Sequence, residues 1–272
     1  MNYIKKEKNF DYAAFNLERL IKLVDLYGPP KLERPVADYL EPLLAKYCSE
    51  INRDEIGNLY AVRQGEAGAS TVLLSSHQDT VFFPEQERFY LVENGYLQLD
   101  RNLLERERYS GAIRAVVLGG DDRAGIEIIL SILETYLGPL TLKIILSTRE
   151  EIGGEGIQDA RREFFRDINF GLVLDRKFSG DIITAIENQT LCTKKLSQHI
   201  FHSGLRLDIK DLRETAGSYS DAYFLSKRFK VDCVNLSVGY FQPHTSLERI
   251  DLYAFNNCVR WVKDILETYP EK

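Results

Sequence analysis

Short apolar runs alternate along this chain with longer stretches of helical periodicity, and this alternation is the feature that most constrains the fold. The apolar runs are bounded by polar or glycine residues, as buried strands are. They predict strands at residues 58–63, 71–76, 142–146, 171–174 and 231–238. The periodic stretches predict helices at residues 11–27, 33–48, 124–136, 157–165, 220–229 and 252–269. Strands that alternate with helices predict an α/β fold with a mostly parallel central sheet.

Composition excludes several classes of protein. The 272 residues are 44% hydrophobic and 28% charged, which is typical of a globular protein with a real core. The net charge of −6 comes from interspersed acids and bases, so no basic stripe indicates a nucleic-acid partner. No apolar stretch is long enough to span a membrane, and no apolar segment follows the N-terminal charges as in a secretory signal. We therefore expect a cytoplasmic protein whose four widely spaced cysteines are free thiols.

One segment interrupts the alternation of strands and helices. The runs at 89–92 and 96–99 flank Glu93-Asn94-Gly95, which is a hairpin signal. Residues 103–109 are strongly charged, and we expect them to form a solvated loop. The segment 84–117 is therefore predicted to be a hairpin and loop excursion within a single catalytic domain that spans residues 1–272.

Five short clusters of carboxylates and histidines lie mostly at the ends of the apolar runs. In order, they are Ser76-His77-Gln78-Asp79-Thr80, Gly119-Gly120-Asp121-Asp122-Arg123-Ala124-Gly125, Arg149-Glu150-Glu151-Ile152-Gly153-Gly154, Leu172-Val173-Leu174-Asp175 and Pro243-His244-Thr245-Ser246-Leu247-Glu248. The crevice of an open α/β sheet lies beyond the carboxyl ends of its strands, where four of the clusters fall. The fifth precedes a helix, whose N-terminal dipole favours a carboxylate. We expect the clusters to converge on one site.

Imidazole nitrogens and carboxylate oxygens are the ligands that a zinc-like cation takes. A pair of such cations about 3.5–4 Å apart can share one carboxylate. The set can be distributed as His77 and Asp175 on one ion, Glu151 and His244 on the other, Asp121 between them and Glu150 as general base. Asp79, two residues after His77, is expected to accept the other imidazole N–H and fix the ring.

Each cluster alone has a plainer interpretation. The histidine–aspartate pair can be a surface pair, the adjacent aspartates a helix cap, and the adjacent glutamates a solvated pair. These interpretations are plausible singly and implausible jointly, given the shared position at the edge of the sheet. The remaining histidines, His199 and His202, have no acidic cluster beside them, and we expect them to be structural.

At these clusters the chain resembles the co-catalytic zinc exopeptidases, the superfamily of peptidase T, the glutamyl aminopeptidases, carboxypeptidase G and acetylornithine deacetylase. It is most similar to peptidase T and the tetrahedral aminopeptidases. Their motifs His-x-Asp-Thr-Val, Gly-x-Asp-Asp-Lys/Arg-x-Gly, Glu-Glu-Ile/Val-Gly and Pro-His-Thr/Ser are matched at His77, Gly119, Glu150 and Pro243. The resemblance implies a three-layer α/β/α fold and two divalent cations, most simply zinc, with cobalt or manganese as alternatives. It implies the same ligands and the same base.

The chain departs from these families in length. Only 69 positions separate Asp175 from His244, and 44 separate His77 from Asp121. The families usually insert a lid or a β-domain in one of these intervals. We therefore expect a catalytic domain without the usual inserted domain, and the oligomeric state stays open.

The expected activity is metal-dependent hydrolysis of a peptide or small amide, most simply by an aminopeptidase. An N-acyl amino acid deacylase, an amidohydrolase or a carboxypeptidase with the same site is the first alternative, and a metal-binding but inactive relative is the second. We expect no nucleic acid or membrane partner. Four basic residues flank site carboxylates and can hold a substrate carboxylate or pair with the ligands; they are Arg123, Arg149, Arg176 and Lys177.

Overall fold

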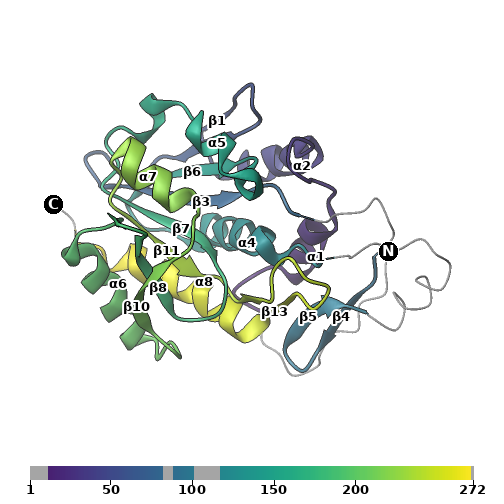
Figure 1. Ribbon diagram of the computed structural model, residues 1–272. Coiled ribbons are helices and arrows are strands. Elements are labelled where there is room, and N and C mark those ends of the chain that lie inside the picture. The colour runs from purple at the N-terminus through teal and green to yellow at the C-terminus, as the bar shows by residue number, and fades with distance from the viewer. Residues whose placement is uncertain (1–11, 82–87, 101–116, 271–272) are drawn as a thin grey trace.

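The structure, a computed structural model, describes residues 12–81, 88–100 and 117–270 (Figure 1). A nine-stranded sheet runs through them in the order β1-β2-β6-β3-β7-β11-β8-β10, with β9 paired to β8. Its strands are β1 (Glu50–Arg53), β2 (Leu59–Arg63), β3 (Thr71–His77), β6 (Thr141–Ser147), β7 (Phe170–Arg176), β8 (Asp181–Ile186), β9 (Gln189–Thr190), β10 (Arg213–Gly217) and β11 (Cys233–Ser237).

Four central strands, β6, β3, β7 and β11, run parallel to one another. The flanking strands β2 and β8 join this centre antiparallel, and β1 joins β2 in the same way. The prediction of an α/β fold with a mostly parallel central sheet is thereby confirmed. Because the central strands share one direction, their carboxyl ends meet at a single edge of the sheet.

Helices cover both faces of this sheet (Figure 1). They are α1 (Leu17–Asp25), α2 (Arg34–Leu44), α4 (Gly120–Thr135), α5 (Glu155–Gln158), α6 (Lys194–Arg206), α7 (Asp221–Phe229) and α8 (Leu252–Glu267), with short 3-10 turns η1 (Glu150–Ile152) and η2 (Arg162–Phe165). Alternate residues of the strands face two hydrophobic cores: Val72 and Leu74 of β3 lie in one, and Leu73 lies in the other. The first core is covered by α1, α2, α4, α6 and α8, and the second by α5, η2 and α7. The three layers follow from this division.

A second, smaller sheet has the order β12-β13-β5-β4. Its strands are β4 (Tyr90–Glu93), β5 (Tyr96–Leu99), β12 (Tyr240–Phe241) and β13 (Arg249–Asp251). The predicted hairpin is confirmed as β4 and β5, which turn at Asn94 and Gly95, both with positive φ. The rest of the predicted excursion, including the charged run at 103–109, lies almost entirely outside the described residues. Since β12 and β13 flank the loop that carries His244, this sheet anchors the last of the five clusters.

One predicted helix is wrong in form. Residues 157–165 do not form one helix but contain the end of α5 and the 3-10 turn η2. The chain turns between them where the backbone N–H of Arg161 donates to the Tyr60 hydroxyl at 3.1 Å. Phe165 then stacks on Phe229 of α7, with 4.2 Å between ring centroids. These tertiary contacts stabilise the break. The sequence patterns also gave no prediction for α6, β8 or β10.

Two further expectations concern the chain as a whole. None of the helices among the described residues is long and apolar enough to cross a membrane. All four cysteines are free, as predicted, and Cys233 and Cys258 are buried.

Candidate metal centre

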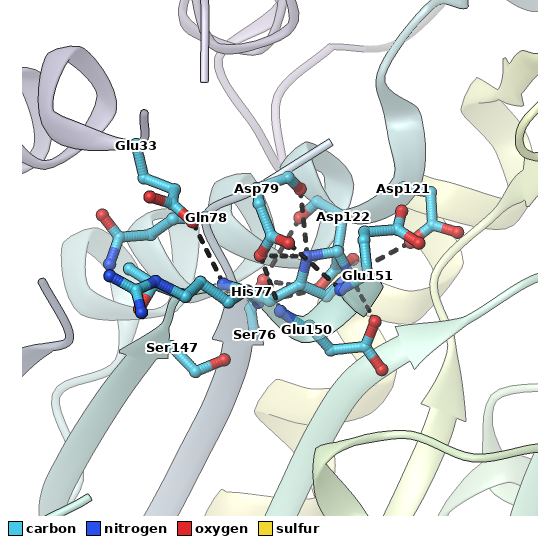
Figure 2. Close-up of polar contacts among 12 residues, drawn as sticks. Glu33, Ser76, His77, Gln78, Asp79, Asp121, Asp122, Ser147, Glu150 and Glu151 are labelled. Atoms are coloured by element: carbon cyan, nitrogen blue, oxygen red, sulfur yellow. Dashed lines mark hydrogen bonds and ion pairs between the residues drawn. The ribbon is translucent and has the colours of Figure 1, made fainter. Parts of the chain in front are cut away.

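The five clusters converge at the carboxyl edge of the central strands. Each is positioned by a different element: His77 ends β3, Asp121 lies at the start of α4, Glu150 and Glu151 form η1 just after β6, Asp175 lies near the end of β7, and His244 lies in the loop between β12 and β13. The close-up shows the side chains of the first three clusters gathered around the His77 ring (Figure 2). The helix α4 packs against β3 and β7, which brings Asp121 to this edge.

Asp121 lies between the two histidines. Its Oδ1 is 3.2 Å from Nε2 of His77, and its Oδ2 is 3.2 Å from Nε2 of His244. Each carboxylate oxygen thus faces a different imidazole. A carboxylate that presents one oxygen to each of two donor sets has the geometry expected of a bridging ligand.

A second carboxylate accompanies each histidine. Asp175 Oδ1 is 3.6 Å from Nε2 of His77, and Glu151 Oε1 is 2.9 Å from Nε2 of His244. Asp175 thus lies beside His77 and Glu151 beside His244, and the assignment of each pair to one ion stays a prediction. His77, Asp121 and Glu151 place donor atoms within 4.8 Å of one another, so together they can hold a metal ion.

Glu150 and Glu151 are adjacent, yet both carboxylates reach the site because η1 is a turn rather than a strand. Its flanking residues Arg149, Gly153 and Gly154 all have positive φ, which curls the backbone beyond the end of β6. Glu150 Oε2 lies 4.0 Å from Nε2 of His77. The glycines make this turn accessible without steric cost, as the sequence indicated.

Asp79 has a different main contact from the predicted one. The nearest acceptor to Nδ1 of His77 is the backbone carbonyl of Asp79 at 3.0 Å, whereas the Asp79 carboxylate is 3.5 Å away. Its two carboxylate oxygens instead accept the backbone N–H groups of Glu150 and Glu151, each at 3.0 Å. Those amides are part of a tight turn and need acceptors, so Asp79 both borders the His77 ring and positions the two glutamates.

Two acids of the site were not anticipated in their roles. Asp122, which is fully buried, accepts the Ser76 hydroxyl and the backbone N–H of Gly125, and it forms a second possible metal group with His77 and Asp175. Glu248 is 3% exposed. Its carboxylate accepts the backbone N–H groups of Gly119 and Asp121. The only feature of the sequence that pointed to Glu248 was its position four residues after His244.

The site concentrates negative charge in a buried place. Burial alone would lower the pKa of His77, but hydrogen bonds to its carboxylate neighbours, Asp121 foremost, hold the pKa well above its ordinary value. Hydrogen bonds to Asp121 and Glu151 raise the pKa of His244 to about 10. Burial raises the pKa of Glu150 well above its ordinary value, and nearby carboxylates add to this effect. The carboxylates outnumber the imidazoles, and the donor atoms converge, so the residues fit divalent cations.

A cleft of about 390 Å³ opens beside the site. Site residues on its wall include Asp121, Glu150, Glu151, Asp175 and His244. The cleft is also lined by residues from the strand ends and from the segment before α7, namely Arg176, Lys177, Ile183, Ser218, Tyr219, Ser220, Asn235, Tyr240 and Pro243. A cleft of this size next to the donor atoms can admit a small ligand.

Of the four basic residues that flank the clusters, two line the cleft and two do not. Arg123 is fully buried and donates to the backbone carbonyl of Gln78, and Arg149 pairs with Glu155 at 3.2 Å. Neither lines the cleft, whereas Arg176 and Lys177 do.

The other two histidines lie on α6, away from the clusters. His199 is hydrogen-bonded to the backbone carbonyl of Ile265 in α8, at 3.1 Å. Among the described residues, neither His199 nor His202 belongs to a group that can hold a metal ion.

Comparison with sequences of known proteins gives distant relatives. No protein-family model matches the chain. A Bacillus subtilis protein, the uncharacterized protein YqjE, is 25% identical over 202 residues, which are 70% of this chain and 50% of that protein. A putative [LysW]-lysine/[LysW]-ornithine hydrolase of Pyrococcus furiosus is 35% identical over 83 residues, 30% of this chain and 23% of that protein. The chain thus spans about half, or less, of the length of the curated relatives it matches.

Solved structures share the fold more completely. The aminopeptidase PepT of Bacillus cereus has a TM-score of 0.76 and 18% identity, covering 94% of this chain and 99% of that one. A tripeptidase of Staphylococcus aureus also has a TM-score of 0.76, with 16% identity over 94% and 99% of the two chains. A TET aminopeptidase from a thaumarchaeon has a TM-score of 0.70 and 15% identity, over 93% and 96%. The chain therefore has the fold of these peptidases.

Proposed function

We propose that this protein is a metal-dependent peptide hydrolase, and more specifically an aminopeptidase that uses two divalent cations and Glu150 as general base. The observation that carries the proposal is the position of Asp121, whose two carboxylate oxygens each lie 3.2 Å from a different histidine. A helix cap or a solvated pair would have no reason to stand between two imidazoles. The peptidase fold of the structural neighbours supports the same reading.

In the proposed site, His77 and Asp175 would hold one cation, Glu151 and His244 would hold the other, and Asp121 would contribute to both. When bound, the cations lower the pKa of water and polarise the scissile carbonyl. Zinc is the first choice for this donor set, and cobalt or manganese would also suit it. Asp79 and Glu248 act through the backbone, since they hold the amides of Glu150, Glu151 and Asp121 in place.

Glu150 is the proposed proton carrier. Its carboxylate can accept a proton from the attacking water and then release it to the leaving amine. The carboxylate is 16% exposed and lies on the wall of the cleft, so it can meet a substrate there. General bases in such positions contribute roughly 10²- to 10⁴-fold in rate.

The choice of an aminopeptidase rests on the motifs and on the activities for which the similar proteins are named. The Asp-Asp-Arg and Glu-Glu-Ile-Gly forms are those of the aminopeptidase branch, and several structural neighbours are aminopeptidases. The second candidate is a deacylase or amidohydrolase with the same site. It is favoured by the relative that is named a [LysW]-lysine/[LysW]-ornithine hydrolase.

The experiment that tests the proposal is digestion followed by mass spectrometry. The purified protein would be incubated with zinc, cobalt or manganese and with matched free-amine and N-acetylated peptides. Glu150→Gln should bind metal and fold but lose turnover, and Glu163→Gln, on the exposed surface of η2, serves as the matched control.

Stepwise loss of N-terminal residues from free-amine peptides alone is the expected result. Cleavage of the acetylated set would favour the second candidate. Normal activity of Glu150→Gln, or metal binding without any turnover, would overturn the proposal.

A further inference from the structure

The turn that carries Glu150 and Glu151 is held by two acidic side chains from other parts of the chain. Three successive backbone N–H groups, those of Arg149, Glu150 and Glu151, each donate to a carboxylate. Asp79 accepts the second and the third, and Glu33 accepts the first through its Oε1 at 3.1 Å. Glu33 does not belong to the proposed donor set, and it does not line the cleft.

Arg149 needs such an acceptor because its backbone is strained. It has φ 56° and ψ 34°, a left-handed conformation that residues other than glycine rarely adopt. A residue keeps a conformation of this kind only where its surroundings determine it. The carbonyl of Arg149 accepts the N–H groups of Gly154 at 3.0 Å and Glu155 at 3.2 Å. The hydrogen bond to Glu33 fixes the N–H side of the same residue.

Glu33 is itself firmly placed. It is the N-cap residue of α2 and is only 5% exposed. The oxygen that accepts the N–H of Arg149 also accepts the backbone N–H of Lys31, at 2.9 Å. In the close-up, Glu33 lies on the opposite side of His77 from Asp121 (Figure 2). Its carboxylate therefore faces the turn rather than the cleft.

A buried cation accompanies the two carboxylates that hold the turn. Arg123 is fully buried and donates to the backbone carbonyls of Gln78 and Leu26. Burial lowers the pKa of this guanidinium to about 9, and the charges of Asp79 and Glu33 both favour its protonated form. Because the guanidinium is fixed near both acids, its charge offsets the repulsion between them. The two carboxylates can therefore lie close together behind the turn.

From these contacts we infer that Glu33 is a positioning residue of the metal centre, which together with Asp79 orients the η1 turn so that Glu150 and Glu151 both reach the site. The inference rests on the proposed function for the roles of the two glutamates. Glu33 is not a catalytic residue, since its carboxylate acts only through the backbone of Arg149. Without this acceptor, the strained backbone of Arg149 would relax and carry the two glutamates away from the site.

The test removes the acceptor and then restores it. Glu33→Ala deletes the carboxylate, whereas Glu33→Gln keeps an oxygen that can accept the same N–H groups. Glu155→Ala is the matched control, because the Glu155 carboxylate contacts the guanidinium of Arg149 at 3.2 Å rather than its backbone N–H. Val36→Ala, at a fully buried position of α2, destabilises this helix without removing a hydrogen bond to the turn.

We expect kcat of Glu33→Ala to fall by about 10- to 100-fold with little change in KM, since a displacement of about 1 Å at a catalytic group can cost 10²-fold. Glu33→Gln should recover most of the rate, and Glu155→Ala should retain it. Val36→Ala should lose stability and keep its kcat. The inference would be overturned by an unchanged kcat in Glu33→Ala, or by an equal loss of kcat in Glu33→Ala and Val36→Ala.

Two further readouts do not depend on turnover. In the metal-free protein, hydrogen–deuterium exchange at residues 149–151 should be faster in Glu33→Ala than in the unaltered protein, and unchanged in Glu33→Gln. Zinc titration should show an affinity about 10- to 100-fold lower in Glu33→Ala, the usual effect of losing a residue that orients a metal ligand.

These readouts separate the inference from the proposed function. If peptides are cleaved but Glu33→Ala changes neither the exchange nor kcat, the inference fails and the proposed function stands. If the unaltered protein cleaves nothing while Glu33→Ala exchanges faster and binds zinc more weakly, the proposed function fails and the positioning of the turn by Glu33 stands. Unchanged exchange together with unchanged zinc affinity in Glu33→Ala would overturn the inference whatever the activity.

Discussion

Glu248 holds the backbone of Asp121: its Oε1 accepts the Asp121 N–H at 3.0 Å. The other oxygen accepts the N–H of Gly119 at 2.8 Å, so one carboxylate spans the first turn of α4. Because Glu248 is 3% exposed, water cannot take over these contacts. The position of the Asp121 side chain therefore depends on a residue that is not itself a proposed metal ligand.

Replacing Glu248 by alanine should destabilise the protein and weaken the metal centre. Two buried amide donors would lose their acceptor, and each such loss costs about 1–3 kcal/mol. Urea denaturation of the metal-free protein measures the free energy of unfolding, and zinc titration measures the affinity. Glu163→Ala, on the surface, is the control. Stability and zinc affinity that both match the control would contradict the positioning role of Glu248.

Asp121→Asn tests the bridge directly. Asparagine keeps the size of the side chain but removes its charge and one of its acceptor oxygens. We expect the variant to bind fewer than two divalent cations per chain, measured by mass-spectrometric metal analysis after dialysis. Asp208→Asn, an exposed position on the loop after α6, should leave the metal content unchanged. Full loading of Asp121→Asn would mean that the two donor sets do not share this carboxylate.

The pKa of the buried Asp221 carboxyl leads us to expect that the stability of the metal-free protein depends on pH. Burial raises the pKa of this carboxyl from 3.8 to about 7, although the Ser147 hydroxyl donates to it. Below about pH 4 the Asp221 carboxyl holds its proton in both the folded and the unfolded state. Between the pKa of the unfolded state, 3.8, and that of the folded state, about 7, only the folded state keeps this proton. Asp221 therefore makes folding less favourable as pH rises from about 4 to 7, by up to about 1.4 kcal/mol per pH unit.

The difference between Asp221→Asn and the unaltered protein measures this contribution together with the effect of the Asp221 charge on neighbouring groups such as Glu150. Urea denaturation in the presence of a chelator, at several pH values, should show the variant gaining relative stability between pH 4 and 7. Parallel stability curves for the two proteins would rule out the assignment.

Removing the cations should lower the melting temperature. A ligand present at 100 times its dissociation constant stabilises a folded protein by about 2.7 kcal/mol. For a chain of this length that corresponds to roughly 5–10 °C. Scanning calorimetry with chelator and then with excess zinc measures the shift, which His77→Ala should abolish and His202→Ala should not. A melting temperature indifferent to zinc would contradict a metal site built on His77.

The central strands and the long helices could be predicted from the sequence because their apolar periodicity is strong. Most residues of β3, β6 and β7 are buried, and each strand carries its polar cluster at the carboxyl end. α6 was not anticipated because its apolar face is mixed with lysine, histidine and serine. β10 was not anticipated because its residues, Arg213–Gly217, carry no apolar run and none is buried. Its position depends on pairing with β8, which no local pattern encodes.

The candidate site, like the fold, could be predicted from the sequence only in part. The donor residues could be proposed because their chemical types and spacing form a recognisable set, and the structure brings His77, Asp121, Glu151 and His244 together. The contacts of Asp79 and Glu248 with backbone amides could not, because the direction of an N–H group depends on the turn that carries it. The sequence therefore indicated which atoms could bind a cation, but of the contacts that hold these atoms it suggested only the one between Asp79 and His77.

The dispersion of the donors among five elements has a consequence for how the protein acquires its cations. His77 and His244 are separated by 167 positions, and they meet only when the central sheet and the small sheet are both in place. Contacts of such long sequence separation are closed at high entropic cost and therefore form late in folding. An unfolded or half-folded chain presents isolated carboxylates with little affinity. In the proposed site, high-affinity cation binding thus requires that both sheets are in place.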